Sequence, residues 1–477
     1  MVFSSPEFLF FFLPGVLASY FLLPRRWRNS VLMVASLIFY IFGGGALVLI
    51  LLISIVVDYF AGRIVARARF THSEKGVRLG VLLSVAVNIG LLGYFKYANF
   101  AVDQLNSVGA SLGLGTIAWT SVILPIGISF YTFQSMSYTI DIARGRVEPI
   151  RNPLDFALYV SLFPQLIAGP IVRFHEISDQ ISERSTTLDD FSEGVVRFVH
   201  GLAKKVVIAD SVALIVEPVF SLPVGDLTTG AVWLGVIAYT IQIYFDFSGY
   251  SDMAVGLGLM FGFRFPENFR RPYSAISITD FWRRWHITLS NWFRDYVYIP
   301  LGGSRKGEAQ TYLNLSIVFL LTGLWHGANW TFVVWGAYHG TLLIIERVTG
   351  QRPIGDDAPN SWPRRTYTLM AVMIGWVLFR ADSIAHAWGL LTVMFSPSFG
   401  PLPPEVAVVL TTRVQLTLLL SSLVFLLPGT FVAGPYLATQ SGRLASAGRI
   451  GLMLVGLPFS LALVSSGAFS PFLYYQF

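Results

Sequence analysis

The chain is dominated by long runs of apolar residues that short polar segments separate. A helix needs about 20 predominantly apolar residues to cross the hydrocarbon core of a membrane. Residues 3–23 form one such run, which we interpret as a retained membrane anchor because it has neither a basic leader nor a small-residue cleavage site. Residues 31–57 form a second run, and its interruption by Gly43-Gly44-Gly45 predicts two shorter helices bent at the glycines. Further apolar runs lie near 79–95, 118–139, 155–172, 206–221, 231–247, 250–263, 311–325, 329–346, 366–380, 413–437 and 449–469.

The lengths of these runs, together with the side of the membrane on which basic loops belong, predict an all-α, polytopic integral membrane protein with about 11 to 13 transmembrane helices. We also expect one or two re-entrant segments. Residues 155–172 are a candidate, because Pro164 and the pair Gly169-Pro170 break a helix that protein or water must then surround. No polar segment is long enough for a soluble domain, so we predict one transmembrane domain over residues 1–477. Residues 350–477 are assigned only membrane helices.

The composition excludes several classes of protein. Charged residues make up 13% of the 477 positions and apolar residues 54%, whereas soluble domains carry about 25% charged residues. This scarcity of charge rules out a soluble globular domain and a disordered chain. The absence of Cys rules out a disulfide scaffold, a Cys-ligated metal and a thiol enzyme, and we predict no metal site. The net charge of +6 requires no nucleic-acid partner, because cytoplasmic membrane loops are basic and the expected partner is the lipid bilayer.

Residues 264–310 form the longest polar interruption. They contain eight basic and four acidic residues, so we expect a cytoplasmic basic loop. Its centre, SITDFWRRWHITLSNWFRDYVYIP (277–300), predicts one helix with aromatic side chains on one face and basic side chains on the other. That pattern is typical of a helix lying in the membrane interface.

Two interpretations of this helix stay open. Its arginines contact lipid phosphates, or Arg283, Arg284 and Arg294 receive an anionic cytoplasmic ligand such as a coenzyme. The planar guanidinium suits phosphate because it offers paired donors. His286 lies where the polar and apolar faces meet, so it is either structural or lines an entrance.

His326 lies in LLTGLWHGANWTFVVWGAYHG (320–340). We expect its helix to begin near Tyr312, and a helix of about 13 residues is only about 20 Å long. The chain should therefore turn at 323–329 while still at membrane depth, where a titratable side chain indicates function. Neutral imidazole accepts a proton near pH 7, which suits a general base. The alternative is a histidine that only hydrogen-bonds between helices, and His339 is a weaker candidate.

Two acids also fall at membrane depth, Asp246 and Asp252 in YFDFSGYSDMA. Such an acid needs a partner or a wet cavity. Either acid could orient a histidine, or could pair with a nearby arginine, and we favour the structural pairing. The sequence contains no Walker-type loop, no HExxH and no GxSxG.

The segment FWRRWHITLSNWFRDYVYIPLGG, followed by GLWHGANWTFVVWGAYHG, resembles the membrane-bound O-acyltransferase (MBOAT) family, and within it the bacterial alginate O-acetylation branch. The segments LGYFKYANF, LPIGISFYTFQSMSYTID, LFPQLIAGPIVRF, GLAKKVVIAD and YFDFSGYSDMAVGLGLMFGFRFPENFRRPY are similar to the same branch. The resemblance extends to about residue 347. It implies a multi-helix fold with a funnel on each face and a thin central layer. It matches the family's membrane-embedded histidine to His326 and a second functional histidine to His286.

The resemblance also implies an activity. The expected enzyme is a membrane-bound O-acetyltransferase of the bacterial inner membrane. It passes an acetyl group from a cytoplasmic donor, expected to be acetyl-CoA, to an exopolysaccharide such as alginate, with periplasmic acetyl-transfer proteins as partners. No cofactor is expected to be permanently bound.

For the mechanism, we expect His326 to deprotonate or position the acceptor hydroxyl. Trp325 or Asn329 would support the oxyanion, and the three arginines would hold coenzyme phosphates. A histidine-bound acetyl intermediate is a variant of this mechanism. The alternatives are D-alanyl transfer from a carrier protein to a cell-envelope polymer, and a transporter or scaffold of a polysaccharide-export complex.

Overall fold

The computed structural model describes residues 1–354, 362–427, 431–467 and 472–473. These residues form helices and connecting segments without a strand, so the all-α prediction is confirmed. They cluster into two compact units, and the single transmembrane domain over 1–477 stays a prediction. The first unit is Met1–Phe191 with Leu257–Pro266, and the second is Ser192–Gly256 with Glu267–Phe477.

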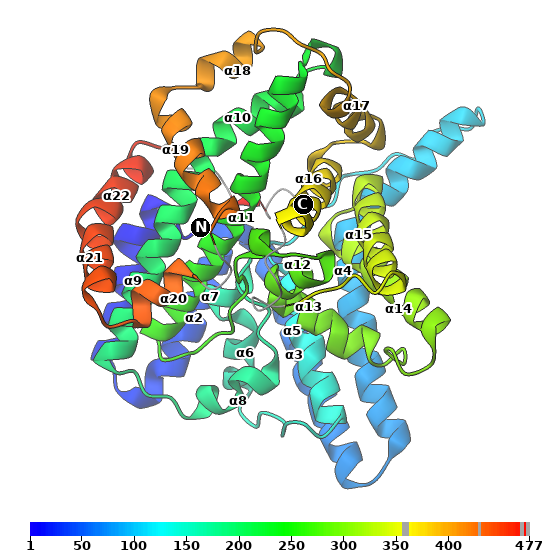
Figure 1. The fold of residues 1–477 in the computed structure, drawn as a ribbon. Helices are drawn as coiled ribbons and strands as arrows, with labels where there is room; N and C mark the ends of the chain where they lie inside the picture. Colours follow the sequence, from blue (N-terminus) through cyan, green and yellow to red (C-terminus); the bar gives the residue numbers. More distant parts are fainter. Residues whose placement is uncertain (355–361, 428–430, 468–471, 474–477) are drawn as a thin grey trace. The chain divides into compact units, whose positions relative to one another are not determined.

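The first unit consists mainly of α-helices (Figure 1). Its elements are a π-helix (Phe8–Phe12), α1 (Leu13–Leu22), a 3₁₀ turn (Arg25–Trp27), α2 (Arg28–Gly44), a 3₁₀ turn (Gly45–Leu47), α3 (Val48–Phe70), α4 (Glu74–Ser111), α5 (Ile128–Ala143), α6 (Pro153–Ser161), α7 (Phe163–Leu166) and α8 (Phe174–Ser182). The break between α2 and α3 confirms the bend predicted at the glycines. Gly45 has φ +53°, a left-handed conformation that glycine adopts at little cost.

A buried polar network joins α3 to α4 in this unit. The Asp58 carboxylate accepts hydrogen bonds from the Ser84 hydroxyl and, at 2.7 Å, from the Asn88 amide. All three side chains are fully buried, whereas large apolar residues such as Leu82 (64% exposed) point outward. Apolar residues outside and hydrogen-bonded polar residues inside are the arrangement expected of helices surrounded by lipid.

The second unit holds every residue that the sequence analysis selected as a site candidate. Its helices are α9 (Leu188–Ala203, which begins in the first unit), α10 (Asp210–Ser221), α11 (Thr229–Met260), α12 (Ile278–Arg284), α13 (Ile287–Phe293), α14 (Glu308–His326), α15 (Trp330–Val348), α16 (Trp362–Arg380), α17 (Ile384–Phe395), α18 (Pro404–Val409), α19 (Thr412–Ser422), α20 (Ala433–Thr439), α21 (Arg443–Gly451) and α22 (Leu457–Ser465). Short π-helices (Lys204–Ala209, Arg294–Tyr298, Leu452–Gly456) and 3₁₀ turns (Val224–Asp226, Pro272–Ser274, Leu423–Phe425) complete it.

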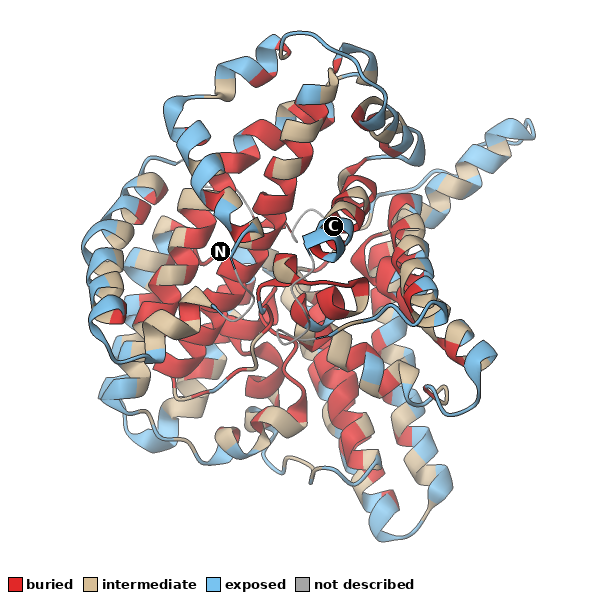
Figure 2. Cartoon of the chain, viewed as in Figure 1, coloured by how far each residue is buried: buried red, intermediate tan, exposed pale blue. Residues whose placement is uncertain are grey.

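Helix α11 forms the core of the second unit. Figure 2 shows buried residues along most of its length, whereas α21 and α22 are largely exposed. We had separated the runs 231–247 and 250–263, and that prediction is wrong because one continuous helix contains most of both. Two residues lie between them, and the second, Gly249, packs against α9, where its missing side chain allows the close approach of Gly201.

The prediction of a single interfacial helix over the centre of 264–310 is also wrong, because the structure has two helices there. Helix α12 ends at Arg284, His286 adopts φ +43°, and α13 begins at Ile287. The break is held by Asn268, whose carbonyl oxygen accepts from the Ile287 N–H. The aromatic face is core: Phe281, Trp285, Leu289, Trp292 and Tyr296 are at most 8% exposed.

The helix that leads to His326 is longer than we predicted. Helix α14 begins at Glu308 and has 19 residues, so its length is about 28 Å at 1.5 Å per residue. The argument from a short helix is therefore wrong. The predicted turn does occur, between His326 and Asn329, the N-cap of α15.

In the described part of the chain, four helical stretches are long and apolar enough to cross a membrane, namely Arg25–Phe70, Glu74–Ser111, Thr229–Met260 and Arg443–Ser465. The count of 11 to 13 crossings stays a prediction. The chain does break within 155–172, because α6 ends at Ser161, α7 has four residues, and no helix follows until α8. Whether this segment is re-entrant also stays a prediction.

Candidate active site

His326 is the last residue of α14 and is 4% exposed. Helix α14 ends here because Gly327 is extended and Asn329 starts α15. The imidazole lies among aromatic rings, with the centroids of Trp335 and Phe379 each 5.1 Å away. The local sequence thus places a titratable ring inside the protein at a helix end.

His286 lies between α12 and α13 and is fully buried. Its Nδ1 lies 3.1 Å from Oδ1 of Asn268, and an amide oxygen only accepts, so Nδ1 carries the hydrogen. Burial lowers the pKa of His286 to about 3. The ring is therefore neutral at physiological pH, with a lone pair on Nε2.

One tryptophan separates these two histidines. The Trp325 ring centroid lies 6.0 Å from that of His286 and 4.9 Å from that of His326. On the other side of His326, Trp335 lies 5.0 Å from His339. The structure therefore brings together His286, Trp325 and His326, three of the residues that sequence reasoning selected, and places His339 one ring further on.

The Asn329 side chain is engaged elsewhere. Its Oδ1 accepts from the Thr331 N–H, and its Nδ2 donates to the carbonyl oxygen of Asp382 at 3.0 Å. Both ends of the amide therefore hold the start of α15. The Nδ2 group carries two hydrogens and this contact uses one of them, so the role of Asn329 as an oxyanion donor stays a prediction.

The two acids of α11 pair with cations instead of orienting His286 or His326. Asp246 lies 2.7 Å from the Lys205 ammonium. Asp252 contacts Arg197 at 2.7 Å, Lys204 at 2.8 Å and the imidazole of His200 at 3.1 Å. The arginine pairing that we favoured is found for Asp252, which also contacts a histidine, whereas Asp246 pairs with a lysine.

Three arginines line a cavity of about 710 Å³ beside α12 and α20. Arg283 and Arg284 are two of the three predicted phosphate ligands, and Arg284 also pairs with Asp280 at 3.0 Å. Arg270, which sequence reasoning did not select, lines the same cavity. The third predicted residue, Arg294, instead pairs with its neighbour Asp295 on the surface and is not among the lining residues.

Basic residues around this cavity could hold an anionic group such as a coenzyme phosphate. The sequence signal that could have found Arg270 is the pair Arg270-Arg271 in ENFRRPY, which directly precedes the buried Pro272–Ser274 turn.

Comparison with known proteins places this geometry in a family. A model of the MBOAT, membrane-bound O-acyltransferase family, matches residues 149–385. The chain is 46% identical to the probable alginate O-acetylase AlgI of Azotobacter vinelandii, over the full length of both proteins. The chain belongs to the membrane-bound O-acyltransferase family. This confirms the resemblance found in the sequence.

As an MBOAT protein, the chain is an acyltransferase and a multi-pass membrane protein. It is 50% identical to the probable alginate O-acetylase AlgI of Pseudomonas syringae pv. tomato, over 83% of this chain and 75% of that protein. It is 37% identical to the peptidoglycan O-acetyltransferase of Helicobacter pylori, over 83% of this chain and 80% of that protein. The family match includes both histidines and the three arginines of that cavity, whereas the lining residues around α20 lie outside the matched range.

Proposed function

We propose that this MBOAT protein transfers an acetyl group from acetyl-CoA to hydroxyl groups of an exopolysaccharide of the alginate type. The names of its relatives support acetyl as the group and a cell-surface polymer as the acceptor. The structural observation that carries the proposal is the buried series His286–Trp325–His326. It supplies a base inside the protein, close to a second histidine that burial keeps neutral.

In the proposed reaction, His326 is the general base. Its imidazole takes the proton of the acceptor hydroxyl while the hydroxyl oxygen attacks the thioester carbonyl carbon. The new C–O bond forms, the C–S bond breaks, and the departing thiolate takes the proton back from the imidazolium. The Trp325 indole N–H stabilises the negative charge that develops on the carbonyl oxygen. His286 offers the Nε2 lone pair to the acceptor and orients it.

We place the donor's phosphates in the cavity lined by Arg270, Arg283 and Arg284. Charge-assisted hydrogen bonds from arginine to phosphate are among the strongest in proteins. The excess of basic residues in 264–310 supports a cytoplasmic location for this cavity. The proposed setting is the bacterial inner membrane, with periplasmic proteins completing transfer to the polymer.

Transfer from labelled acetyl-CoA in membranes containing equal amounts of each variant tests the catalytic role. Loss of a general base lowers such rates by about 10²- to 10⁴-fold, and we expect a loss of that size for His326→Ala. His386→Ala in α17 is the matched control and should keep wild-type transfer. Wild-type transfer by His326→Ala would show that the assignment is wrong.

A further inference from the structure

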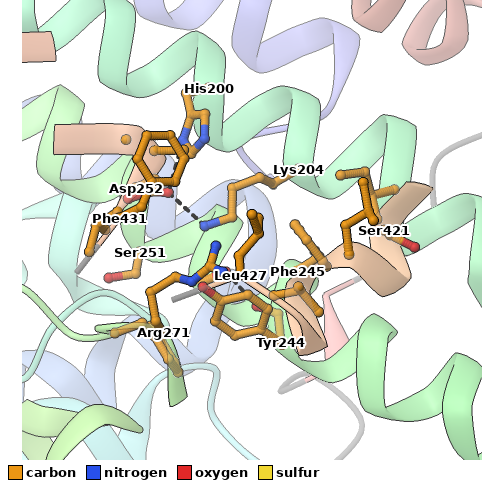
Figure 3. A pocket seen from close by; sticks show the side chains of 18 of the residues that line it. His200, Lys204, Tyr244, Phe245, Ser251, Asp252, Arg271, Ser421, Leu427 and Phe431 are labelled. Carbon is orange, nitrogen blue, oxygen red and sulfur yellow. Dashed lines mark hydrogen bonds and ion pairs between the residues drawn. The ribbon is translucent and has the colours of Figure 1, made fainter. Parts of the chain in front are cut away.

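A second cavity, of about 460 Å³, lies in the second unit beside α11. Its lining residues come from α9, the π-helix 204–209, α11, the segment 267–271, and the stretch from α19 to α20 (Figure 3). Neither His286 nor His326 is among the lining residues that the structure describes. This cavity is therefore distinct from the proposed catalytic histidines.

The charged lining residues do not balance. Arg197, Lys204 and Arg271 are cations, whereas the carboxylates are Asp252 and Glu267. Both carboxylates are occupied. Asp252 contacts Arg197 and Lys204, and Glu267 contacts Arg197 at 2.6 Å. One cation, Arg271, is left without an acid among the lining residues.

The Arg271 side chain is buried in this cavity. It is 7% exposed, and among the described residues its Nε and one terminal nitrogen have no acceptor. Figure 3 shows the guanidinium pointing toward the middle of the lining side chains, near Tyr244 and Lys204. Burial lowers the pKa of Arg271, as expected for a cation without a partner. A buried charge of this kind is strongly unfavourable unless an anion accompanies it.

The backbone holds Arg271 in this position. Its φ is +49°, a left-handed conformation that is unusual for a residue other than glycine. Its carbonyl oxygen accepts from the N–H and, at 2.7 Å, from the hydroxyl of Ser274, which closes the short turn Pro272–Ser274. A strained backbone that aims a buried cation into a cavity is typical of a binding residue.

The remaining wall is mostly apolar and reaches the surface. Phe245, Val424 and Leu427 line it, together with Leu420 and Leu423, which are 63% and 48% exposed. In a multi-pass membrane protein an exposed apolar wall contacts lipid. The cavity thus combines a buried cationic end with an apolar side that opens outward.

We propose that this cavity binds an anionic phospholipid. The phosphodiester accepts hydrogen bonds from Arg271, and one acyl chain lies along the leucines of α19 and the following turn. A coenzyme or free phosphate shares the anionic group but lacks a long apolar chain, so the apolar wall favours the lipid. This cavity adjoins the one proposed for the donor's phosphates, because both are lined by Glu267, Phe269, Phe431, Val432 and Pro435. Arg271 and the leucines line only the lipid cavity, so the inference does not depend on the proposed reaction.

The test is binding of defined ligands to the purified full chain, measured by native mass spectrometry in detergent. The probes are phosphatidylglycerol, a diacylglycerol of the same chain length, coenzyme A and inorganic phosphate. We expect one phosphatidylglycerol to be retained at least about 10-fold more tightly than diacylglycerol, since one charge-assisted hydrogen bond has about that effect. Arg271→Gln should remove this preference. Arg305→Gln, an exposed arginine outside both cavities, should keep it.

A second variant guards against misfolding of Arg271→Gln. Leu420→Trp changes the exposed apolar wall and leaves Arg271 in place. It should therefore weaken phosphatidylglycerol binding without strengthening diacylglycerol binding. The inference is overturned if wild type does not prefer phosphatidylglycerol, if Arg271→Gln binds it as tightly as wild type, or if equimolar coenzyme A displaces it. Acetyl transfer measured on the same preparations shows separately whether the proposed function holds.

Discussion

At the scale of single residues, the two histidines are set apart by their surroundings. His326 ends a regular helix beside Trp325 and Trp335. His286 occupies a left-handed position, and Asn268 fixes the hydrogen on its Nδ1. Both residues could be selected from the sequence. The protonation and tautomer of each imidazole depend on its burial and its partners, and these come from residues distant in the chain.

The buried neutral His286 should make stability depend on pH. Its folded pKa of about 3 lies below the unfolded value of about 6.5. Between these values the unfolded chain binds more protons, so the free energy of unfolding falls as the pH falls from 6.5 toward 3. The slope for one proton is about 1.4 kcal/mol per pH unit.

The matched variant is His286→Asn, because asparagine tolerates the left-handed backbone and does not titrate. Melting temperatures of purified wild type and variant at pH 7.5, 6.5 and 5.5 would check this prediction. The variant should lose less stability than wild type on acidification. Parallel losses in both proteins would show that His286 does not titrate as the structure implies.

At the scale of elements, close helix packing explains features that hydrophobic pattern alone did not. Helix α11 continues through Ser248-Gly249 because α9 packs directly against it. At His286 a tertiary contact instead interrupts the helix, because Asn268 accepts hydrogen bonds from the first N–H groups of α13. In both places a tertiary contact overrides the local pattern.

The contact between α9 and α11 predicts a difference between two glycines of one helix. A Cβ at Gly249 would lie 2.8 Å from the carbonyl oxygen of Gly201, whereas a Cβ at Gly230 would meet nothing within 4 Å. Overpacking of this kind costs about 1 to 3 kcal/mol. Gly249→Ala should therefore lower the melting temperature in detergent, and Gly230→Ala should leave it unchanged or slightly raised. Equal melting temperatures for the two variants would refute the close approach.

At the scale of the whole molecule, arginines of the segment 264–310 line two cavities of the second unit. One is lined by Arg270, Arg283 and Arg284, and the other has Arg271 at its buried end. The sequence showed that basic residues gather in 264–310, but gave no means of sorting them. Residues of α19 line only the cavity with Arg271, whereas α20 contributes to both, and these helices lie more than a hundred residues away in the chain.

The first cavity predicts unequal roles for two exposed arginines of the same loop. Arg283 lines it and Arg294 pairs with Asp295 instead. If the cavity holds the donor's phosphates, Arg283→Gln should raise KM for acetyl-CoA about 3- to 10-fold with little change in kcat. Arg294→Gln should change either constant less than about 2-fold, as expected for an exposed ion pair. Initial rates of acetyl transfer at varied acetyl-CoA would decide, and equal KM values would contradict the assignment.

The sequence by itself determined the all-α class, the membrane setting, the family and the choice of His286 and His326. These follow from run length, scarcity of charge and contiguous motifs, which are local properties of the chain. Only the tertiary structure decided that the aromatic stripe of 277–300 is core, that α14 begins at Glu308, and that Asn329 caps α15. Only it showed that Arg271 is buried and that two of its side-chain nitrogens lack an acceptor among the described residues. The physical reason is that burial and pairing depend on which distant residues the fold brings together.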